Sequence, residues 1–214
     1  MRKKLIIFDL DGTLLNTLGD LTQAVNHALC ECGISIQYSN ETIRTFVGNG
    51  IGKLLERAVP EDIRTEEILA HMRAAFIPYY QKHSIELTCP YPGVVKTLKQ
   101  LQERGILLAV ASNKYQQATE QLVAHYFPGI DFACVFGQRP DVPMKPHPQV
   151  VFDILSATGL QSTDVLYVGD SDVDMLTAQN AHVDVIAVSW GFRPTEVLEM
   201  FNPLAIIDRV EELL

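Results

Sequence analysis

The feature that most constrains the fold is a set of five short apolar runs separated by segments with helical periodicity. The runs are KLIIF (residues 4–8), ILLAVA (106–111), FACVF (132–136), VLYV (165–168) and VDVIAV (183–188). Several of them are apolar throughout rather than alternating, which is typical of strands covered on both faces. Helical patterns lie between them, at residues 94–103, 116–125 and 149–158. This alternation predicts a parallel sheet wrapped by helices.

The region from residue 15 to residue 87 contains no good strand candidate. Helical patterns fill it, at residues 18–32, 41–47 (with Asn40 as the expected N-cap), 51–59 and 66–82. The chain then returns through the turn-rich segment CPYPG (89–93), which we interpret as a hinge. We therefore predict an α/β protein with a Rossmann-like parallel sheet core, residues 1–15 and 88–214, and an inserted α-helical cap domain, residues 16–87. Ligands of open α/β sheets bind beyond the carboxyl ends of the strands, so a cap at this position would cover the site.

Charge and composition argue against two kinds of partner. The net charge of −9 disfavours nucleic acid, because binding a phosphate backbone requires clustered Lys and Arg. The basic residues 2–4 and the following LIIF resemble the start of a signal peptide, but Asp9 and Asp11 interrupt the apolar run too early, and no segment is long enough to span a membrane. The four cysteines, Cys30, Cys32, Cys89 and Cys134, lack zinc-site spacing and suit free thiols in a reducing compartment. We expect a cytoplasmic protein without a membrane partner, either a monomer or a homodimer.

Four polar motifs fall where predicted strands end or predicted helices begin. They are DLDGT (9–13), SN (112–113), KPHP (145–148) and GDSDVD (169–174). Each alone has an ordinary structural explanation, such as an Asp-rich turn or a helix cap. Because all four occur in order at the expected ends, we interpret them as one site.

The first motif supplies two carboxylates that suit phosphoryl chemistry. Asp9 is the candidate nucleophile, and Asp11, two residues further on, leaves an extended chain on the same side. Asp11 could protonate the leaving alkoxide and later deprotonate the water that hydrolyses an aspartyl phosphate. Two unit charges about 4 Å apart repel by roughly 4 kcal/mol at an effective dielectric near 20, so attack on a phosphate requires counter-charge.

A divalent cation would supply most of that counter-charge. Asp9 and Asp170 are the candidate ligands, and a main-chain carbonyl near Asp11 with waters would complete an oxygen shell suited to Mg²⁺. Lys145 would supply the rest, near the start of a predicted helix that also favours anions.

The remaining polar residues are expected to hold the phosphate or to support the groups that do. Ser112 and the amide of Asn113 would bind phosphate oxygens, and Thr13 and Lys145 are also expected to contact substrate. Asp174, one helical turn beyond the metal ligand of its motif, could orient the lysine or support the metal shell.

Together, DLDGT, Ser112, Lys145 in KPHP and GDSDVD resemble the haloacid dehalogenase superfamily in its phosphatase branch, over essentially the whole chain. The resemblance implies Mg²⁺-dependent hydrolysis of a small phosphorylated metabolite through an aspartyl phosphate. It makes Asp9 nucleophile and metal ligand, and Asp11 the acid/base with its carbonyl on the metal. Ser112 and Lys145 would bind phosphate, Lys145 would also contact the nucleophile, and Asp170 would bind metal. The cap segment FVGNG (46–50) and the length resemble phosphoglycolate phosphatases, which makes 2-phosphoglycolate the favoured substrate.

Other functions remain open at this stage. A phosphomutase of a sugar phosphate would use the same aspartyl phosphate, and a pyrophosphatase or nucleotidase would use the same chemistry. A dehalogenase needs neither Asp11 nor Asp170, yet both are present. A non-enzymatic binding module would be expected to have lost at least one catalytic residue, and none is missing.

The segment GNGIGK (48–53) invites a nucleotide-loop interpretation, but Val47 and Leu54 stand where a Walker loop needs Gly and Ser or Thr. We interpret it as a turn between two cap helices that faces the core. Residues in and beside this turn could contribute to substrate choice, and the candidates are Arg44, Asn49, Gly50 and Lys53. Arg44 and Lys53 could equally be ordinary exposed charges on the cap helices.

Overall fold

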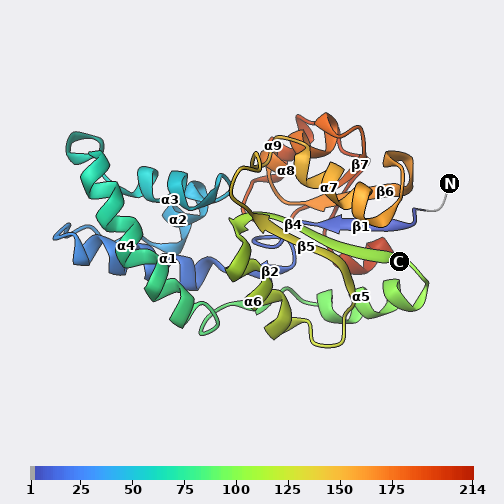
Figure 1. The fold of residues 1–214 in the computed structure, drawn as a ribbon, viewed down its shortest axis with the longest axis horizontal. Coiled ribbons are helices and arrows are strands. Elements are labelled where there is room, and N and C mark those ends of the chain that lie inside the picture. The colour runs from blue at the N-terminus through green and yellow to red at the C-terminus, as the bar shows by residue number, and fades with distance from the viewer. Residues whose placement is uncertain (1–2) are drawn as a thin grey trace.

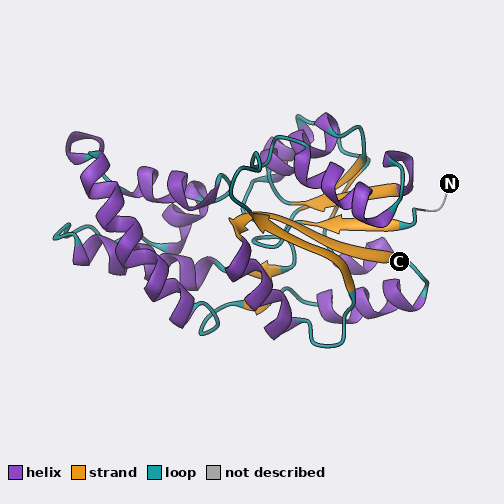
Figure 2. Ribbon diagram, in the orientation of Figure 1, coloured by secondary structure: helices purple, strands orange, loops and turns teal. Residues whose placement is uncertain are grey.

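The computed structural model describes residues 3–214 and consists of a parallel α/β core beside a helical cap (Figures 1 and 2). Its six-stranded sheet has the order β5-β4-β1-β6-β7-β8, and every neighbouring pair is parallel. The strands are β1 (Leu5–Phe8), β4 (Leu107–Tyr115), β5 (Phe132–Gln138), β6 (Val165–Gly169), β7 (Asp184–Val188) and β8 (Ala205–Ile207). The predicted fold class is therefore confirmed. Residues 1 and 2 of the predicted core lie outside the described residues.

Helices cover both faces of this sheet (Figure 1). One face carries α5 (Val94–Glu103), α6 (Gln116–Tyr126) and the short helix η3 (Val210–Leu213), and the other carries α7 (Gln149–Thr158), α8 (Asp172–Asn180) and α9 (Thr195–Glu199). The short helix η2 (Ser162–Asp164) leads into β6. In β1, Ile6 and Phe8 pack into one apolar cluster while Leu5 and Ile7 pack into the other. Because alternate side chains enter different cores, the whole run is apolar.

The cap has its own apolar core, built from the helices between β1 and β4. They are α1 (Leu18–Glu31), α2 (Asn40–Phe46), α3 (Gly50–Ala58), η1 (Glu61–Ile63) and α4 (Glu66–His83). The prediction that Asn40 caps the second helix was wrong, because Ser39 is the N-cap and its hydroxyl accepts the amide of Thr42. Serine caps as well as asparagine does, so only the backbone conformation separates the two positions. Within residues 3–214, no helix combines the length and hydropathy of a membrane span.

The chain crosses between core and cap twice, and the two crossings pair with each other. β2 (Leu15–Asn16) and β3 (Cys89–Pro90) form a short antiparallel ladder. Just beyond it, the buried carboxylate of Asp20 accepts hydrogen bonds from the amides of Leu87 and Thr88, both at 2.9 Å, and from the Thr88 hydroxyl at 2.7 Å. We propose these crossings as the boundary between core and cap, close to the predicted limits after residues 15 and 87.

Two strands of the six-stranded sheet extend by two or more residues beyond their predicted ends, and one strand of that sheet was missed. β4 continues through the polar Ser112 to Tyr115 with a shift of register, and β5 continues to Gln138 beside it. Burial of the extended end, rather than apolar character, keeps these polar residues in the strand. The missed strand β8 contains only three residues at the sheet edge, too few to produce a pattern.

Replacing Asp20 should destabilise the fold, because three donors, two of them buried, would lose a charged acceptor. We expect Asp20→Ala to lower the free energy of unfolding by about 2–4 kcal/mol in urea titrations at pH 7. Asp20→Asn should cost less, since its amide oxygen still accepts. Asp62→Ala, an exposed carboxylate in η1, is the control. A loss below about 1 kcal/mol for Asp20→Ala would contradict this role.

Candidate active site

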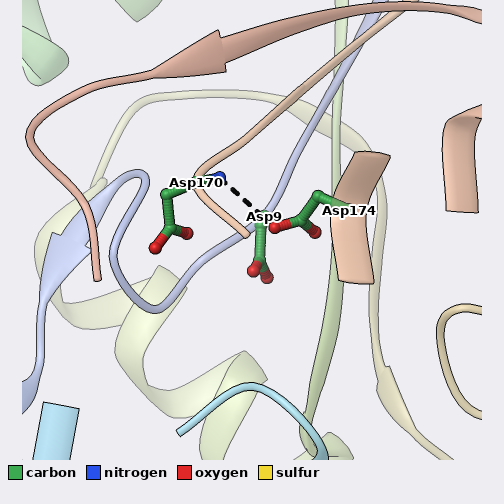
Figure 3. Close-up of side chains that lie close together, drawn as sticks. All are labelled: Asp9, Asp170 and Asp174. Atoms are coloured by element: carbon green, nitrogen blue, oxygen red, sulfur yellow. Dashed lines mark hydrogen bonds between the residues drawn. The ribbon is translucent and has the colours of Figure 1, made fainter. Parts of the chain in front are cut away.

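Three acidic side chains converge at the carboxyl end of the sheet (Figure 3). Oxygens of Asp9, Asp170 and Asp174 lie within 4.8 Å of one another. Asp9 follows β1 and Asp170 follows β6, and these strands are neighbours in register, with Phe8 opposite Val168. The sheet order therefore brings together two residues that are 161 positions apart in the sequence, as the motif analysis predicted.

Asp174 is fully buried and both of its oxygens are engaged. Its Oδ1 accepts from the Lys145 ammonium at 2.7 Å and from the Tyr167 hydroxyl at 3.2 Å. Its Oδ2 accepts from the Ser171 hydroxyl at 2.6 Å and from the amides of Asp170 and Ser171. The sequence S-x-x-D at the start of α8 forms a capping box, which explains this local geometry. Asp174 therefore orients Lys145 and fixes the loop that carries Asp170.

Asp170 is held from two sides and packed against two glycines. Its Oδ1 accepts from the Thr13 hydroxyl at 2.9 Å, and its Oδ2 accepts from the amide of Phe192 at 2.7 Å. A Cβ at Gly12 would lie 2.3 Å from its carboxylate, and one at Gly191 would lie 2.1 Å from its Cβ. Gly12 also has φ of +88°, a conformation that glycine tolerates best. These glycines let two loops close around one buried carboxylate.

Asp9 is paired with Lys145 and keeps one oxygen clear of these contacts. Its Oδ1 accepts from the amide of Leu10 at 2.7 Å and lies 3.0 Å from the Lys145 ammonium. The ammonium also donates to the carbonyl of Ala111 and to the Tyr167 hydroxyl. The predicted contact between Lys145 and Asp9 is thus present in the structure.

Burial and crowding make these carboxylates hard to ionise. Burial raises the pKa of Asp9 well above its ordinary range, and the charge of Asp174 adds to this, while Lys145 opposes it. Burial, followed by the charge of Asp174, raises the pKa of Asp170 from 3.8 to about 7. Both effects reflect buried negative charge without enough positive charge nearby.

The residues present fit a hard divalent cation. Four carboxylates, at residues 9, 11, 170 and 174, face two ammonium groups, at residues 114 and 145, which leaves two net negative charges when all are ionised. Asp174 has its oxygens engaged, whereas Asp9 and Asp170 retain lone pairs of the oxygen type that Mg²⁺ prefers. The acidic triad therefore supports a metal site at Asp9 and Asp170.

Sequence reasoning missed Lys114, which pairs with Asp11. Its ammonium lies 3.0 Å from both Asp11 oxygens, with side-chain exposures of 5% for the lysine and 13% for the aspartate. A lysine after a strand is usually solvated, so its type alone gave no signal. The position of Lys114 did offer a signal, because Ser112 and Lys114 are two residues apart in a strand and share a face.

The other predicted substrate ligands divide into two groups. The Ser112 hydroxyl accepts from the amide of Lys114 at 3.2 Å and keeps its own hydrogen for a ligand. The Asn113 carboxamide instead bonds to the carbonyl of Gly48 and to both main-chain groups of Lys145, so only the amide of Asn113 remains for phosphate. The Thr13 hydroxyl donates to Asp170 and acts on the site through that carboxylate.

A pocket lies between this polar edge and the cap. Asp9, Asp11, Ser112, Lys114 and Asp170 line its core side. The cap wall is largely apolar and consists of Leu21, Val47, Ile51, Leu54, Phe76 and Tyr80, with the main chain at Gly48 and Gly50. The GNGIGK turn therefore faces the core, as predicted.

Two arginines link core and cap reciprocally. Arg44 of α2 donates to the carbonyls of Gly191 and Phe192 in the core. Arg193 donates back to the carbonyls of Arg44 and Val47 in the cap. Because the Phe192 amide binds Asp170, this contact joins the cap directly to the acidic cluster. Among the other candidates in the turn, Lys53 pairs with Glu56 at the surface and Asn49 accepts from Arg57.

The comparison with known families agrees with this geometry. Residues 6–188 match the haloacid dehalogenase-like hydrolase family. The chain belongs to this family, which confirms the resemblance inferred from its motifs and makes it an enzyme of the hydrolase type.

Individual relatives are similar in sequence to this chain over almost its whole length. A phosphoglycolate phosphatase of Pseudomonas savastanoi pv. phaseolicola is 34% identical over 99% of this chain and 78% of its own length. One of Haemophilus influenzae is 33% identical over 99% of this chain and 96% of its own. The crystal structure of a predicted phosphoglycolate phosphatase from Haemophilus somnus is 31% identical, with a TM-score of 0.91 over 100% of this chain and 97% of that one.

The raised pKa of Asp170 predicts how the metal-free protein responds to pH. A carboxylate with a raised folded-state pKa contributes stability that is complete below about pH 4 and is lost as the pH rises through about 7. Asp170→Asn removes this effect, so in EDTA its Tm should fall less than that of the wild type between pH 5 and pH 8. At pH 8, Mg²⁺ should raise the wild-type Tm more than that of the variant. Asp62→Asn is the exposed control, and equal pH slopes for all three proteins would contradict the assignment.

Proposed function

We propose that this protein is a Mg²⁺-dependent phosphatase that hydrolyses a small phosphomonoester through an aspartyl phosphate on Asp9. The observation that carries the proposal is the buried Asp9 carboxylate, 3.0 Å from the Lys145 ammonium and grouped with Asp170 on the wall of the pocket. The names of full-length relatives support phosphatase activity.

The free oxygen of Asp9 is the nucleophile, since its Oδ1 already accepts from Leu10 and Lys145. Attack at phosphorus forms the bond from aspartate to phosphorus and breaks the bond to the leaving oxygen, which takes a proton from Asp11. Asp11 then removes a proton from the water that hydrolyses the acyl phosphate, releasing inorganic phosphate and restoring Asp9.

The remaining residues neutralise and orient the phosphate. Ser112 and Asn113 line the pocket, and the Ser112 hydroxyl and the Asn113 amide would hold non-reacting oxygens of the phosphate. Lys145, which contacts Asp9, would supply a further positive charge beside them. Asp9 and Asp170 would hold Mg²⁺ with the main-chain carbonyl of Asp11, and the ion would supply the positive charge that lets one anion approach another.

The favoured substrate is 2-phosphoglycolate. The names of the relatives support this choice, and so does the cap wall, because Tyr80 is its one side chain with a polar group among the described residues lining the pocket. A sugar phosphate carries several hydroxyl groups that would need partners on that wall, which argues against the phosphomutase alternative. The cytoplasmic location and the oligomeric state stay predictions.

Replacing the nucleophile tests the mechanism. We expect Asp9→Asn to lower kcat for 2-phosphoglycolate with Mg²⁺ at least about 10³-fold, because an amide cannot form the acyl phosphate. Phosphate release measures this, and circular dichroism checks that the variant is folded. A panel of other phosphomonoesters separates an error in the substrate from one in the mechanism. An Asp9→Asn protein with wild-type turnover on any of them would refute the nucleophile.

A further inference from the structure

The pocket is lined by a buried lysine that the proposed mechanism does not use. Lys114 lines the pocket, and both hydrogen bonds of its ammonium found among residues 3–214 go to Asp11. An ammonium has three donors, so at least one remains for a ligand. The residue is only 8% exposed, and a buried charge without a further partner is costly.

Tyr80 brings an unused polar group to the same place from the cap. It is 1% exposed and lines the pocket, and its hydroxyl has no hydrogen-bond partner among the described residues. Its ring lies against the Lys114 ammonium, which is 4.7 Å from the ring centroid. A buried hydroxyl without a protein partner calls for an explanation, and a bound water, ion or ligand is one that a pocket can supply.

The position of Lys114 places it at the leaving-group end of the pocket. Lys145 contacts the nucleophile Asp9, whereas Lys114 contacts Asp11, which protonates the leaving oxygen in the proposed mechanism. In that mechanism the attacking oxygen and the leaving oxygen lie on opposite sides of phosphorus. Lys145 would therefore lie beside the attacking oxygen, and Lys114 beside the leaving oxygen. Lys114 would then contact the substituent that the leaving alcohol carries next to its oxygen.

We propose that Lys114 and Tyr80 form a subsite for a carboxylate on the leaving group, which restricts the enzyme to short phosphomonoesters whose alcohol is a hydroxy acid. This inference rests on the proposed function and deepens it. The lysine supplies the charge, and the tyrosine supplies a hydroxyl only when the cap is in place. A carboxylate is the chemical class that matches an ammonium beside an O–H donor.

The competing explanation is that Lys114 only positions Asp11. A positioning lysine would affect every phosphomonoester equally, whereas a carboxylate subsite would affect only substrates with a carboxylate. The pair 2-phosphoglycolate and 2-hydroxyethyl phosphate separates the two, since they differ only in a carboxylate against a hydroxymethyl group. The measured quantity is the ratio of their kcat/KM values.

We expect the wild type to prefer 2-phosphoglycolate and Lys114→Met to lower this ratio about 10- to 100-fold, the loss typical of a hydrogen bond to a charged group. Tyr80→Phe should lower it about fivefold, and Lys114→Arg should keep most of the preference. Matched controls are Lys82→Met, an exposed lysine in α4 of the cap, and Tyr38→Phe, whose hydroxyl bonds to Ala58. Both should leave the ratio unchanged.

A binding measurement distinguishes failure of the subsite from failure of the proposed function. In the Asp9→Asn background, 2-phosphoglycolate should raise Tm more than 2-hydroxyethyl phosphate does, and adding Lys114→Met should abolish the difference. Equal losses for both substrates in Lys114→Met, or a wild type without preference, would overturn the subsite while leaving the phosphatase intact. A wild type that hydrolyses neither compound but still binds the carboxylate ligand preferentially would support the subsite and overturn the function.

Discussion

Repulsion among buried carboxylates is the interaction on which the rest of this structure depends. Three of them have oxygens within 4.8 Å of one another, and at such a distance each pair of charges repels by roughly 3 kcal/mol at an effective dielectric near 20. The surrounding residues offset part of this repulsion. Lys145 contacts Asp9 and Asp174, and hydroxyl and amide donors hold the oxygens of Asp170. The charge still unmatched is what a divalent cation would offset, so the same excess that costs stability creates a metal site.

The cap completes the site in two ways. Its apolar wall lies over the polar edge of the sheet and lowers the exposure of the charged groups there to water, which strengthens their electrostatic contacts. Arg44 of the cap donates to the carbonyls of Gly191 and Phe192, and the amide of Phe192 holds Asp170. The position of the cap and the orientation of Asp170 are therefore connected through Arg44 and the Gly191–Phe192 segment. Tyr80 also reaches the pocket from the cap.

The sequence alone predicted the parts that depend on local pattern. Continuous apolar runs marked the central strands, and turn motifs after them marked Asp9 and Asp170, because residues at the carboxyl ends of neighbouring parallel strands must meet. Other parts depend on tertiary contacts that no local pattern reports. Ser39 displaced Asn40 as a cap through backbone conformation alone. Lys114 is buried where Tyr80 of the cap lies against its ammonium. The contact between Asp174 and Lys145, by contrast, was expected from the position of Asp174 one helical turn beyond Asp170.

A crystal structure with Mg²⁺ and a phosphate mimic bound tests the central claim most directly. The account predicts one ion about 2.1 Å from oxygens of Asp9 and Asp170, with the mimic between the ion and Lys145. Asp174 should remain bound to the lysine rather than to the metal. An ion held elsewhere, or a mimic bound away from Asp9 with the acidic cluster unchanged, would contradict the account.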